Sequence, residues 1–139
     1  MKKYTGTKTV KAMPMTMGEA YERKLLKKGV RPSECETDKA GYLVEYEDSY
    51  QSWSPAEPFE KAYKLSETFL DRLRIEYAEV KKRFISLDNF YKKGFDGVAE
   101  IVGARQAALL LCQMSSMRTY VEVLETRIED IEQSMKNDK

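Results

Sequence analysis

The architecture of this chain is decided by residues 107–135, AALLLCQMSSMRTYVEVLETRIEDIEQSM. Apolar residues recur through this stretch at alternating steps of three and four, and a second series with the same spacing begins at Leu70 and ends at Tyr91. Such a period places one apolar seam along each of two long helices that pack side by side. The two seams consist of Leu70, Leu73, Tyr77, Val80, Phe84, Leu87 and Tyr91, and of Ala107, Leu110, Met114, Met117, Val121, Leu124, Ile128, Ile131 and Met135.

The ends of these helices can be placed from capping and turn residues. We expect the first helix to begin near Ser66 and to end at about Tyr91. Two glycines in residues 92–97 indicate the connection, and the second helix is expected to begin between Val98 and Arg105. The sequence therefore predicts a long, antiparallel, coiled-coil-like helical hairpin over residues 65–139.

Residues 1–64 have a different pattern, which mixes short strands and short helices. A strand is expected in residues 8–15, a helix from Met17 to about Lys28 with Thr16 as its cap, and a hairpin of residues 41–46 and 50–53. Ser54 is expected to cap a short last helix, with Pro55 at its first position. The whole chain is thus predicted to be α+β and mainly α, with a small N-terminal module of residues 1–64 ahead of the hairpin.

Composition argues against several classes of function. The net charge is +1; residues 1–64 carry 12 basic and 10 acidic residues (+2), and residues 65–139 carry 12 and 13 (−1). Neither part has the basic bias of a protein that binds long nucleic acids. Histidine, the commonest metal ligand and general base, is absent, so we expect neither a metal site nor an enzyme and infer no cofactor. No apolar run is long enough to span a membrane, and a cytoplasmic protein with free thiols at Cys35 and Cys112 is expected.

The hairpin carries more apolar surface than two seams can bury. Residues 107–112 are apolar on every side of the helix, and Phe69, Ile75, Ile85 and Phe90 lie off the first seam. Either the N-terminal module covers this surface or the hairpins of several copies pack together. We favour a homo-oligomer, because closed symmetric assemblies are the usual form.

Gln113 is the most informative polar residue, because it lies inside the apolar run next to a seam position. A buried amide must find hydrogen-bond partners. It can therefore set the register between helices, or it can contact a ligand at a subunit interface together with Arg105, Arg118 or Tyr120. Lys92 and Lys93, ahead of the two glycines of the connection, suggest either an anion cradle or a simple helix–helix turn.

Two resemblances add to this interpretation. Residues 66–131 resemble an uncharacterised helical accessory family of crAss-like and other tailed phages, through Arg72, Glu76, Val80, Leu87, Phe90, Leu109, Leu110, Gln113, Met117, Tyr120, Leu124 and Arg127. Residues 2–63 resemble a small phage module, through KTVKAMPMT (8–16), GYLVEY (41–46), Tyr50, SWSP (52–55), Phe59, Glu60, Ala62 and Tyr63. The chain departs from that module at residues 22–25, where relatives carry a segment similar to Tyr-Arg-Gly-Trp.

The second resemblance implies a function by association. In similar phage proteins this module precedes domains that resemble anti-CBASS or anti-Thoeris sponges, which sequester cyclic nucleotides or related immune signals without cleaving them. The resemblance implies a non-enzymatic phage counter-defence protein in the host cytoplasm that binds a small nucleotide signal. The alternatives are a helical module that inhibits or recruits a host protein, and a component of virion assembly.

Overall fold

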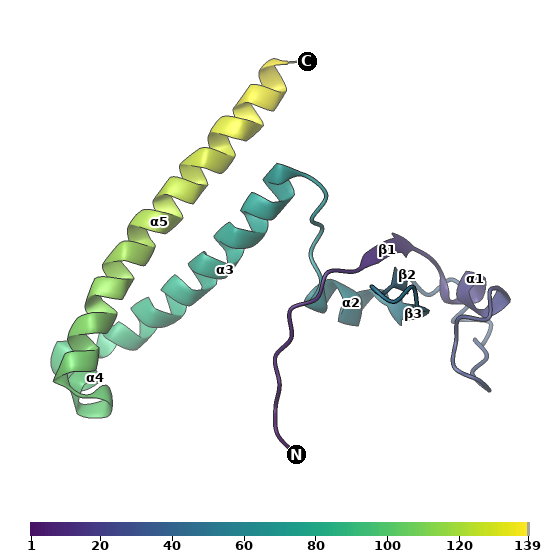
Figure 1. Ribbon diagram of the computed structural model, residues 1–139, viewed down its shortest axis with the longest axis horizontal. Coiled ribbons are helices and arrows are strands. Elements are labelled where there is room, and N and C mark those ends of the chain that lie inside the picture. The colour runs from purple at the N-terminus through teal and green to yellow at the C-terminus, as the bar shows by residue number, and fades with distance from the viewer. Residues whose placement is uncertain (139) are drawn as a thin grey trace. The chain divides into compact units, whose positions relative to one another are not determined.

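The computed structural model describes residues 1–138, and the chain divides into two compact units, Met1–Lys64 and Leu65–Lys139. Unit 1 holds a three-stranded antiparallel sheet with two short helices, and unit 2 consists of helices alone. The predicted α+β class is confirmed (Figure 1). In the described part of the chain, no helix combines the length and the hydrophobicity that crossing a membrane requires.

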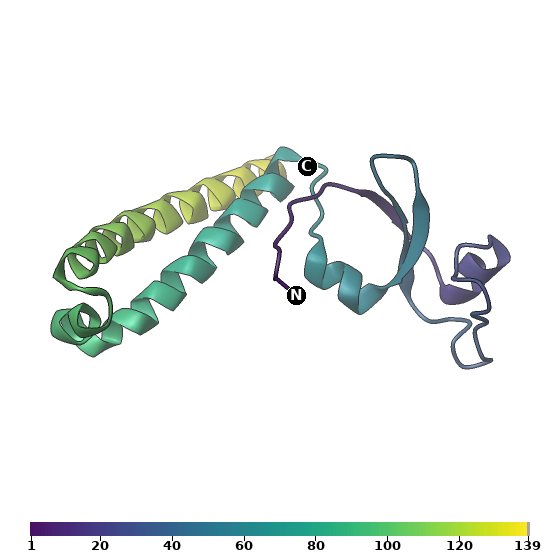
Figure 2. The same cartoon turned by 60° about the horizontal axis from the view of Figure 1, so that its bottom comes forward.

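The sheet of unit 1 has the strand order β1-β2-β3, with β1 Lys11–Pro14, β2 Gly41–Glu45 and β3 Gln51–Pro55. Both pairings are antiparallel, and the register sets Met13 beside Leu43 and Leu43 beside Trp53. The predicted hairpin is confirmed and corresponds to β2 and β3 (Figure 2). The Trp53 indole nitrogen donates a 2.8 Å hydrogen bond to the Met15 carbonyl, which ties the sheet to the segment after β1.

Helix α1, Met17–Glu22, is shorter than expected. The Thr16 hydroxyl accepts from the Glu19 amide as predicted, but the helix ends before Arg23 rather than near Lys28. Lys24 adopts the left-handed conformation (φ +59°), its amide donates to the Tyr21 carbonyl, and the Leu25 amide donates to the Ala20 carbonyl. This pair of bonds is a Schellman motif, which terminates the helix although no glycine is present there.

Helix α2, Ala56–Ala62, also begins differently from the prediction. Pro55 is the last residue of β3 and the N-cap of α2, so the expected cap by Ser54 with Pro55 inside the helix is wrong. The Ser54 hydroxyl instead donates to the carbonyl of Pro55 itself. Phe59 of α2 stacks between Tyr42 and Tyr63, at centroid distances of 4.3 and 5.1 Å, and this stacking holds α2 against β2.

Unit 2 is the predicted hairpin, formed by α3, Phe69–Phe90, and α5, Ala104–Asn137, which pack against each other (Figure 1). Every seam residue is buried or half-buried except Met135, which lies in the last helical turns. Leu70 and Leu73 of α3, and Val121 and Leu124 of α5, are the most deeply buried residues between these helices. The heptad spacing therefore identified the faces that meet.

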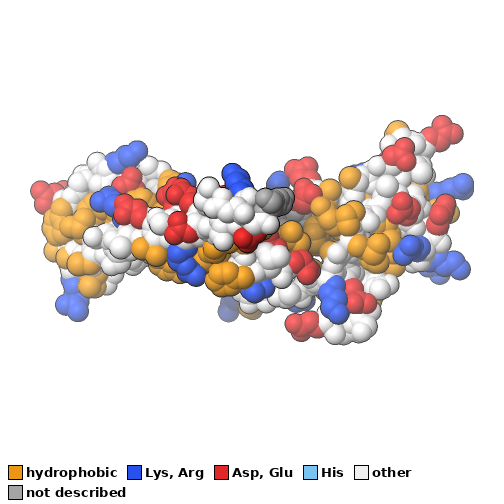
Figure 3. Space-filling view, turned by 90° about the horizontal axis from the view of Figure 1, so that it is seen from above, with side chains coloured by type: hydrophobic (Ala, Val, Ile, Leu, Met, Phe, Trp, Pro, Cys, Tyr) orange, Lys and Arg blue, Asp and Glu red, His pale blue; other side chains and the backbone are white. Residues whose placement is uncertain are grey.

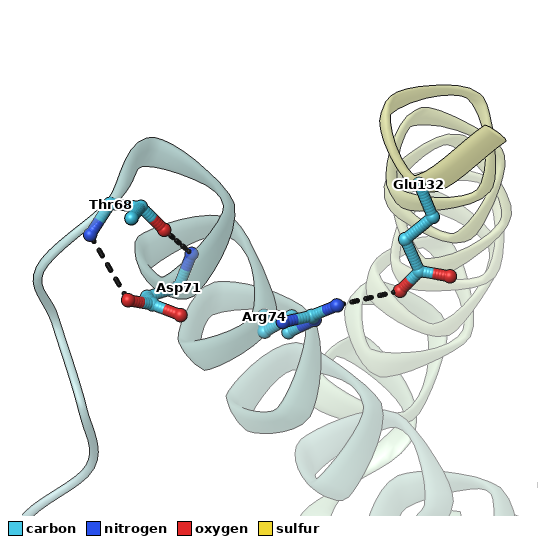
Figure 4. Close-up of polar contacts among 4 residues, drawn as sticks. All are labelled: Thr68, Asp71, Arg74 and Glu132. Atoms are coloured by element: carbon cyan, nitrogen blue, oxygen red, sulfur yellow. Dashed lines mark hydrogen bonds and ion pairs between the residues drawn. The ribbon is translucent and has the colours of Figure 1, made fainter. Parts of the chain in front are cut away.

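The first turn of α3 is fixed by a capping box (Figure 4). The Thr68 hydroxyl accepts from the Asp71 amide at 3.0 Å, and the Asp71 carboxylate accepts from the Thr68 amide at 3.0 Å. These bonds, led by that from the Thr68 backbone, hold the pKa of Asp71 below its ordinary value. One turn further, Arg74 pairs with Glu132 of α5 at 2.9 Å across the hairpin.

The connection between the long helices contains a helix that the sequence did not predict. A 3₁₀ helix, η1 (Tyr91–Lys93), leads directly into α4, Gly94–Val102, and α5 begins two residues later. Helix α4 packs on α5, and Val98 and Ala107 are fully buried. The expectation of a simple turn over residues 92–97 is therefore wrong; Gly94 and Gly103, both with positive φ, mark the two ends of α4.

Candidate functional site

A groove runs along one side of the hairpin between α3 and α5. Its volume is about 760 Å³, within the range of small-molecule sites. It is lined by Glu79, Lys82, Arg83, Ser86, Leu87 and Phe90 of α3, and by Leu110, Gln113 and Met117 of α5. The α5 residues are spaced by three and four, and the α3 residues lie in successive turns at 79, 82–83, 86–87 and 90, so each helix contributes one continuous wall to the groove.

The α3 wall carries the charge of the groove. Lys82 and Arg83 are adjacent and exposed, with Glu79 one turn before them and Ser86 one turn after. A guanidinium can bind a phosphate group through two parallel hydrogen bonds, and an ammonium adds a second positive charge. The hydroxyl of Ser86 adds a group that can donate to the same anion.

The α5 wall contributes Gln113 to the same groove. Its amide nitrogen lies 3.8 Å from the sulfur of Met117, one turn along the helix. In the single chain Gln113 is exposed, whereas burial was expected, and a ligand contact of Gln113 at a subunit interface stays a prediction. Within one chain the Gln113 amide therefore makes no buried hydrogen bond that sets the register between the helices. Its exposed side borders the groove.

Phe90 and Lys93 mark the end of the groove nearest to the connection. The ammonium of Lys93 lies 5.8 Å from the centroid of the Phe90 ring, a cation–π distance. Lys92 and Lys93 belong to η1, and both are exposed. The structure thus brings Lys93 beside a residue that lines the groove, whereas Lys92 is not among the lining residues.

Tyr120 and Arg118 lie on different sides of α5. Tyr120 is seven residues from Gln113 and only about 20° away around the helix, whereas Arg118 is five residues away and about 140° around it. The Tyr120 hydroxyl donates to Glu76, and this hydrogen bond raises the pKa of Tyr120. The Arg118 guanidinium lies over the ring of Phe84 at 5.6 Å. Both predicted ligand residues therefore already join α5 to α3.

Arg105 is exposed in the first turn of α5, eight residues before Gln113, and does not line the groove. Of the six residues singled out from the sequence, Gln113 alone lines the groove and Lys93 adjoins it. Sequence reasoning missed Lys82 and Arg83. The signal that could have found them is KKR at residues 81–83, the chain's one run of three basic residues.

In residues 1–138, no cluster of three or more Cys, Asp or Glu side chains is arranged to hold a metal ion. A second, smaller hollow in unit 1, of about 560 Å³, lies between residues 8–10 and the β2–β3 turn. The stacked rings of Tyr46 and Tyr50, 6.1 Å apart, form part of its lining.

Comparison with known proteins bears on the hairpin alone. No curated protein and no solved structure matches the chain significantly. A family model does match: residues 67–130, which include α3, α4 and most of α5 and therefore the whole groove, are similar to the family described as Sequestin, a name that suggests sequestration of a molecule.

Proposed function

We propose that the helical hairpin sequesters a small phosphate-bearing signal of the cyclic-nucleotide type, and releases it unchanged. The observation that carries this proposal is the groove that Lys82, Arg83 and Gln113 line together. The similarity to Sequestin supports the sequestering role. The nucleotide class rests on the chemistry of the groove and on the resemblance of residues 2–63 to the phage module.

Each part of a nucleotide has a matching group in the groove. Lys82 and Arg83 would bind the phosphates by charge-assisted hydrogen bonds. Phe90 would stack on a base, since aromatic rings stack on all four bases, and Leu87, Leu110 and Met117 provide the apolar surface that a base and sugar cover. The Gln113 amide can donate and accept at the same time, as the edge of a base requires.

Binding without reaction is the simplest activity for this site. The side chains that line the groove supply cations, an amide, a hydroxyl and apolar surface, together with the one carboxylate of Glu79. We therefore propose a non-enzymatic counter-defence protein of phage origin that acts in the host cytoplasm by lowering the free concentration of an immune signal. A homo-oligomer formed through the hairpins is part of this proposal, because Leu109 and Leu111 are 49% and 44% exposed in a single chain.

The proposal is tested by a retention assay on the full chain. Purified protein is mixed with a panel of cyclic dinucleotides, cyclic trinucleotides and ADP-ribose-type signals, and unbound nucleotide is collected through a filter. The protein is then heat-denatured, and the released nucleotide is analysed by mass spectrometry. We expect one signal to be retained and to return intact. Return of an altered nucleotide would indicate an enzyme, and free passage of every signal would overturn the proposal.

A second candidate function is supported by the exposed apolar residues of α5. Leu109, Leu111 and Val123 form surface that a host protein could cover instead of a second copy. Such a module would inhibit or recruit its partner by helix packing. The two functions differ in stoichiometry: a monomer that captures a host protein and retains no nucleotide favours the second.

A further inference from the structure

A second heptad series runs along the side of α5 that faces away from α3. Eight residues follow one another there at alternating steps of four and three, and all eight are exposed in the single chain. Val123 of this series lies about 160° around the helix from Val121, one of the residues buried between α3 and α5. We call this series the outer seam; it consists of Arg105, Leu109, Cys112, Ser116, Thr119, Val123, Thr126 and Asp130.

The outer seam lacks the charged residues that usually face water. Its six inner members are uncharged, and Arg118 is the one charged residue between Arg105 and Glu122. The Arg118 guanidinium lies over the ring of Phe84 on α3, so it does not cover the seam. Figure 3 shows hydrophobic side chains gathered at the end of unit 2 that carries α4, which is also the end at which the outer seam begins. A heptad series of uncharged residues is typical of a face that packs against another helix.

The polar atoms in the middle of the outer seam already have partners. The hydroxyls of Ser116, Thr119 and Thr126 each donate to the carbonyl four residues before them, at 3.1, 3.3 and 3.0 Å. A hydroxyl that is bonded in this way can be covered without leaving a buried donor unsatisfied. Small side chains also let two helix axes approach closely. The middle of the seam is therefore suited to contact with a second helix.

The two ends of the outer seam carry opposite charges. Arg105 is its first member and Asp130 its last, and within residues 1–138 neither forms an ion pair. We propose that the outer seam packs against the outer seam of a second copy in an antiparallel arrangement, in which each Arg105 lies beside the partner subunit's Asp130. This contact gives the homo-oligomer of the proposed function a defined interface and rests on that function in this respect alone.

The outer seam is its own complement in this register. The twofold axis lies midway between Ser116 and Thr119, and the alternating spacing reads the same from either end, as an antiparallel pairing of two identical helices requires. Each larger side chain meets a smaller one. The inner layers are Leu109 with the partner subunit's Thr126, Cys112 with the partner subunit's Val123, and Ser116 with the partner subunit's Thr119.

Charge and length favour this arrangement over a parallel one. A parallel pairing would place Arg105 beside the partner subunit's Arg105 and Asp130 beside the partner subunit's Asp130, and like charges at close range repel. In the antiparallel pairing both ends attract. The contact extends over about 38 Å of each helix, from the first turn of α5 to its last third.

Disulfide trapping tests the register without any ligand. In full-length protein with Cys35→Ser, Val123→Cys places a thiol opposite the partner subunit's Cys112. We expect mild oxidation to form a covalent dimer at least tenfold faster than in Glu125→Cys, the matched control, which is exposed on the same helix but about 160° around it from Val123. Equal rates in the two variants, or a monomeric mass of the parent protein by light scattering, would overturn the proposal.

Peptide mapping of the covalent dimer identifies the linked positions. Because disulfides need Cα atoms within about 7 Å, the bond should join Cys112 of one copy to position 123 of the other. Two copies of Cys112 are about 16 Å apart along the helix in this register, so the Cys35→Ser protein alone should not cross-link. Bonds between identical positions would overturn the antiparallel register.

Charge reversal tests the ends of the seam. Arg105→Asp and Asp130→Arg should each raise the Kd of the dimer about tenfold, since two attractive pairs per dimer become repulsive, and the double variant should restore the Kd to within about threefold. Failure of the double variant to recover, with helix content unchanged by circular dichroism, would overturn the pairing. A protein that forms the expected disulfide but retains no nucleotide would contradict the proposed ligand alone, whereas retention of a nucleotide by a monomer would contradict this interface alone.

Discussion

The hydroxyl of Tyr120 on α5 donates a 2.6 Å hydrogen bond to the carboxylate of Glu76 on α3. The two residues are 44 positions apart in the sequence, and their contact joins the helices on the side that carries the groove. Together with the pair of Arg74 and Glu132, it joins α3 to α5 across the hairpin. In this register the two helices form a groove that Lys82, Arg83 and Gln113 line.

The first prediction concerns Tyr120. The hydrogen bond to Glu76, followed by burial, raises the pKa of Tyr120 above its ordinary value of 10.0. The protonated phenol is therefore favoured in the folded state, and its contribution to stability is present below pH 10 and is lost as the pH rises through the folded pKa. Tyr120→Phe should lower the Tm of the hairpin at neutral pH. It should also remove the part of the stability loss at alkaline pH that comes from ionisation of Tyr120. NMR titration of labelled tyrosine should show a lower pKa for Tyr120 in Glu76→Gln; an unchanged pKa would contradict the assignment.

The second prediction concerns the start of α3. Thr68→Ala removes the acceptor for the Asp71 amide and should cost about 1 kcal/mol, a fall in Tm of about 4–8 °C for a unit of this size. Thermal unfolding followed by circular dichroism measures this. Ser66→Ala is the control, because Thr68 and not Ser66 is the N-cap. A larger loss in the control would show that the cap is at Ser66.

The third prediction is a stabilising substitution. Lys24 adopts a left-handed conformation that costs most residues about 1–2 kcal/mol and glycine almost nothing. Lys24→Gly should therefore stabilise unit 1 by about 1 kcal/mol, despite the greater entropy of glycine in the unfolded chain. Trp53, the single tryptophan, lies in unit 1, so urea unfolding followed by its fluorescence reports this unit. Lys28→Gly, at a residue without positive φ, should give no gain.

The long helices were predicted well, because their buried residues recur at steps of three and four. This spacing is visible within each stretch of the sequence. The prediction failed at α4, because Gly94 and Gly97 suggested an open turn, whereas Gly94 ends η1 and begins α4, and Gly97 lies inside α4. It failed at α1, because the left-handed residue that ends this helix is Lys24. A glycine usually occupies such a position and would have indicated the end of the helix in the sequence.

The candidate site was predictable only in part, for a different reason. Gln113 and the cations of the α3 wall are separated by about 30 positions, and their proximity depends on the register between two helices. The heptad series defines which sides of the helices meet but leaves that register open. Tyr120 and Arg118 were therefore grouped with Gln113 by nearness in sequence, whereas each contacts α3 at a different place.

The fourth prediction concerns the close contact at Gly41. A Cβ added to Gly41 would collide with the Trp53 ring and with the carbonyl oxygen of Ser54. Gly41→Ala should therefore destabilise unit 1 by about 1–3 kcal/mol, since the half-buried ring, held by its hydrogen bond to Met15, and the backbone cannot move freely. Gly6→Ala is the control, because a Cβ there meets no atom within 4 Å. Equal unfolding midpoints of the two variants, measured by Trp53 fluorescence, would contradict the packing at β2.

The last prediction concerns the charged wall of the groove. Lys82→Gln and Arg83→Gln should each weaken retention of the bound nucleotide by about 10- to 100-fold, the loss expected when a charged hydrogen bond to phosphate is removed. Lys81→Gln is the matched control, because the Lys81 ammonium donates to the Tyr77 hydroxyl at 3.0 Å and does not line the groove. Circular dichroism should show the same helix content in all three variants. Equal losses in all three would indicate attraction by overall charge, whereas a loss confined to Lys82 and Arg83 would place the phosphate in the groove.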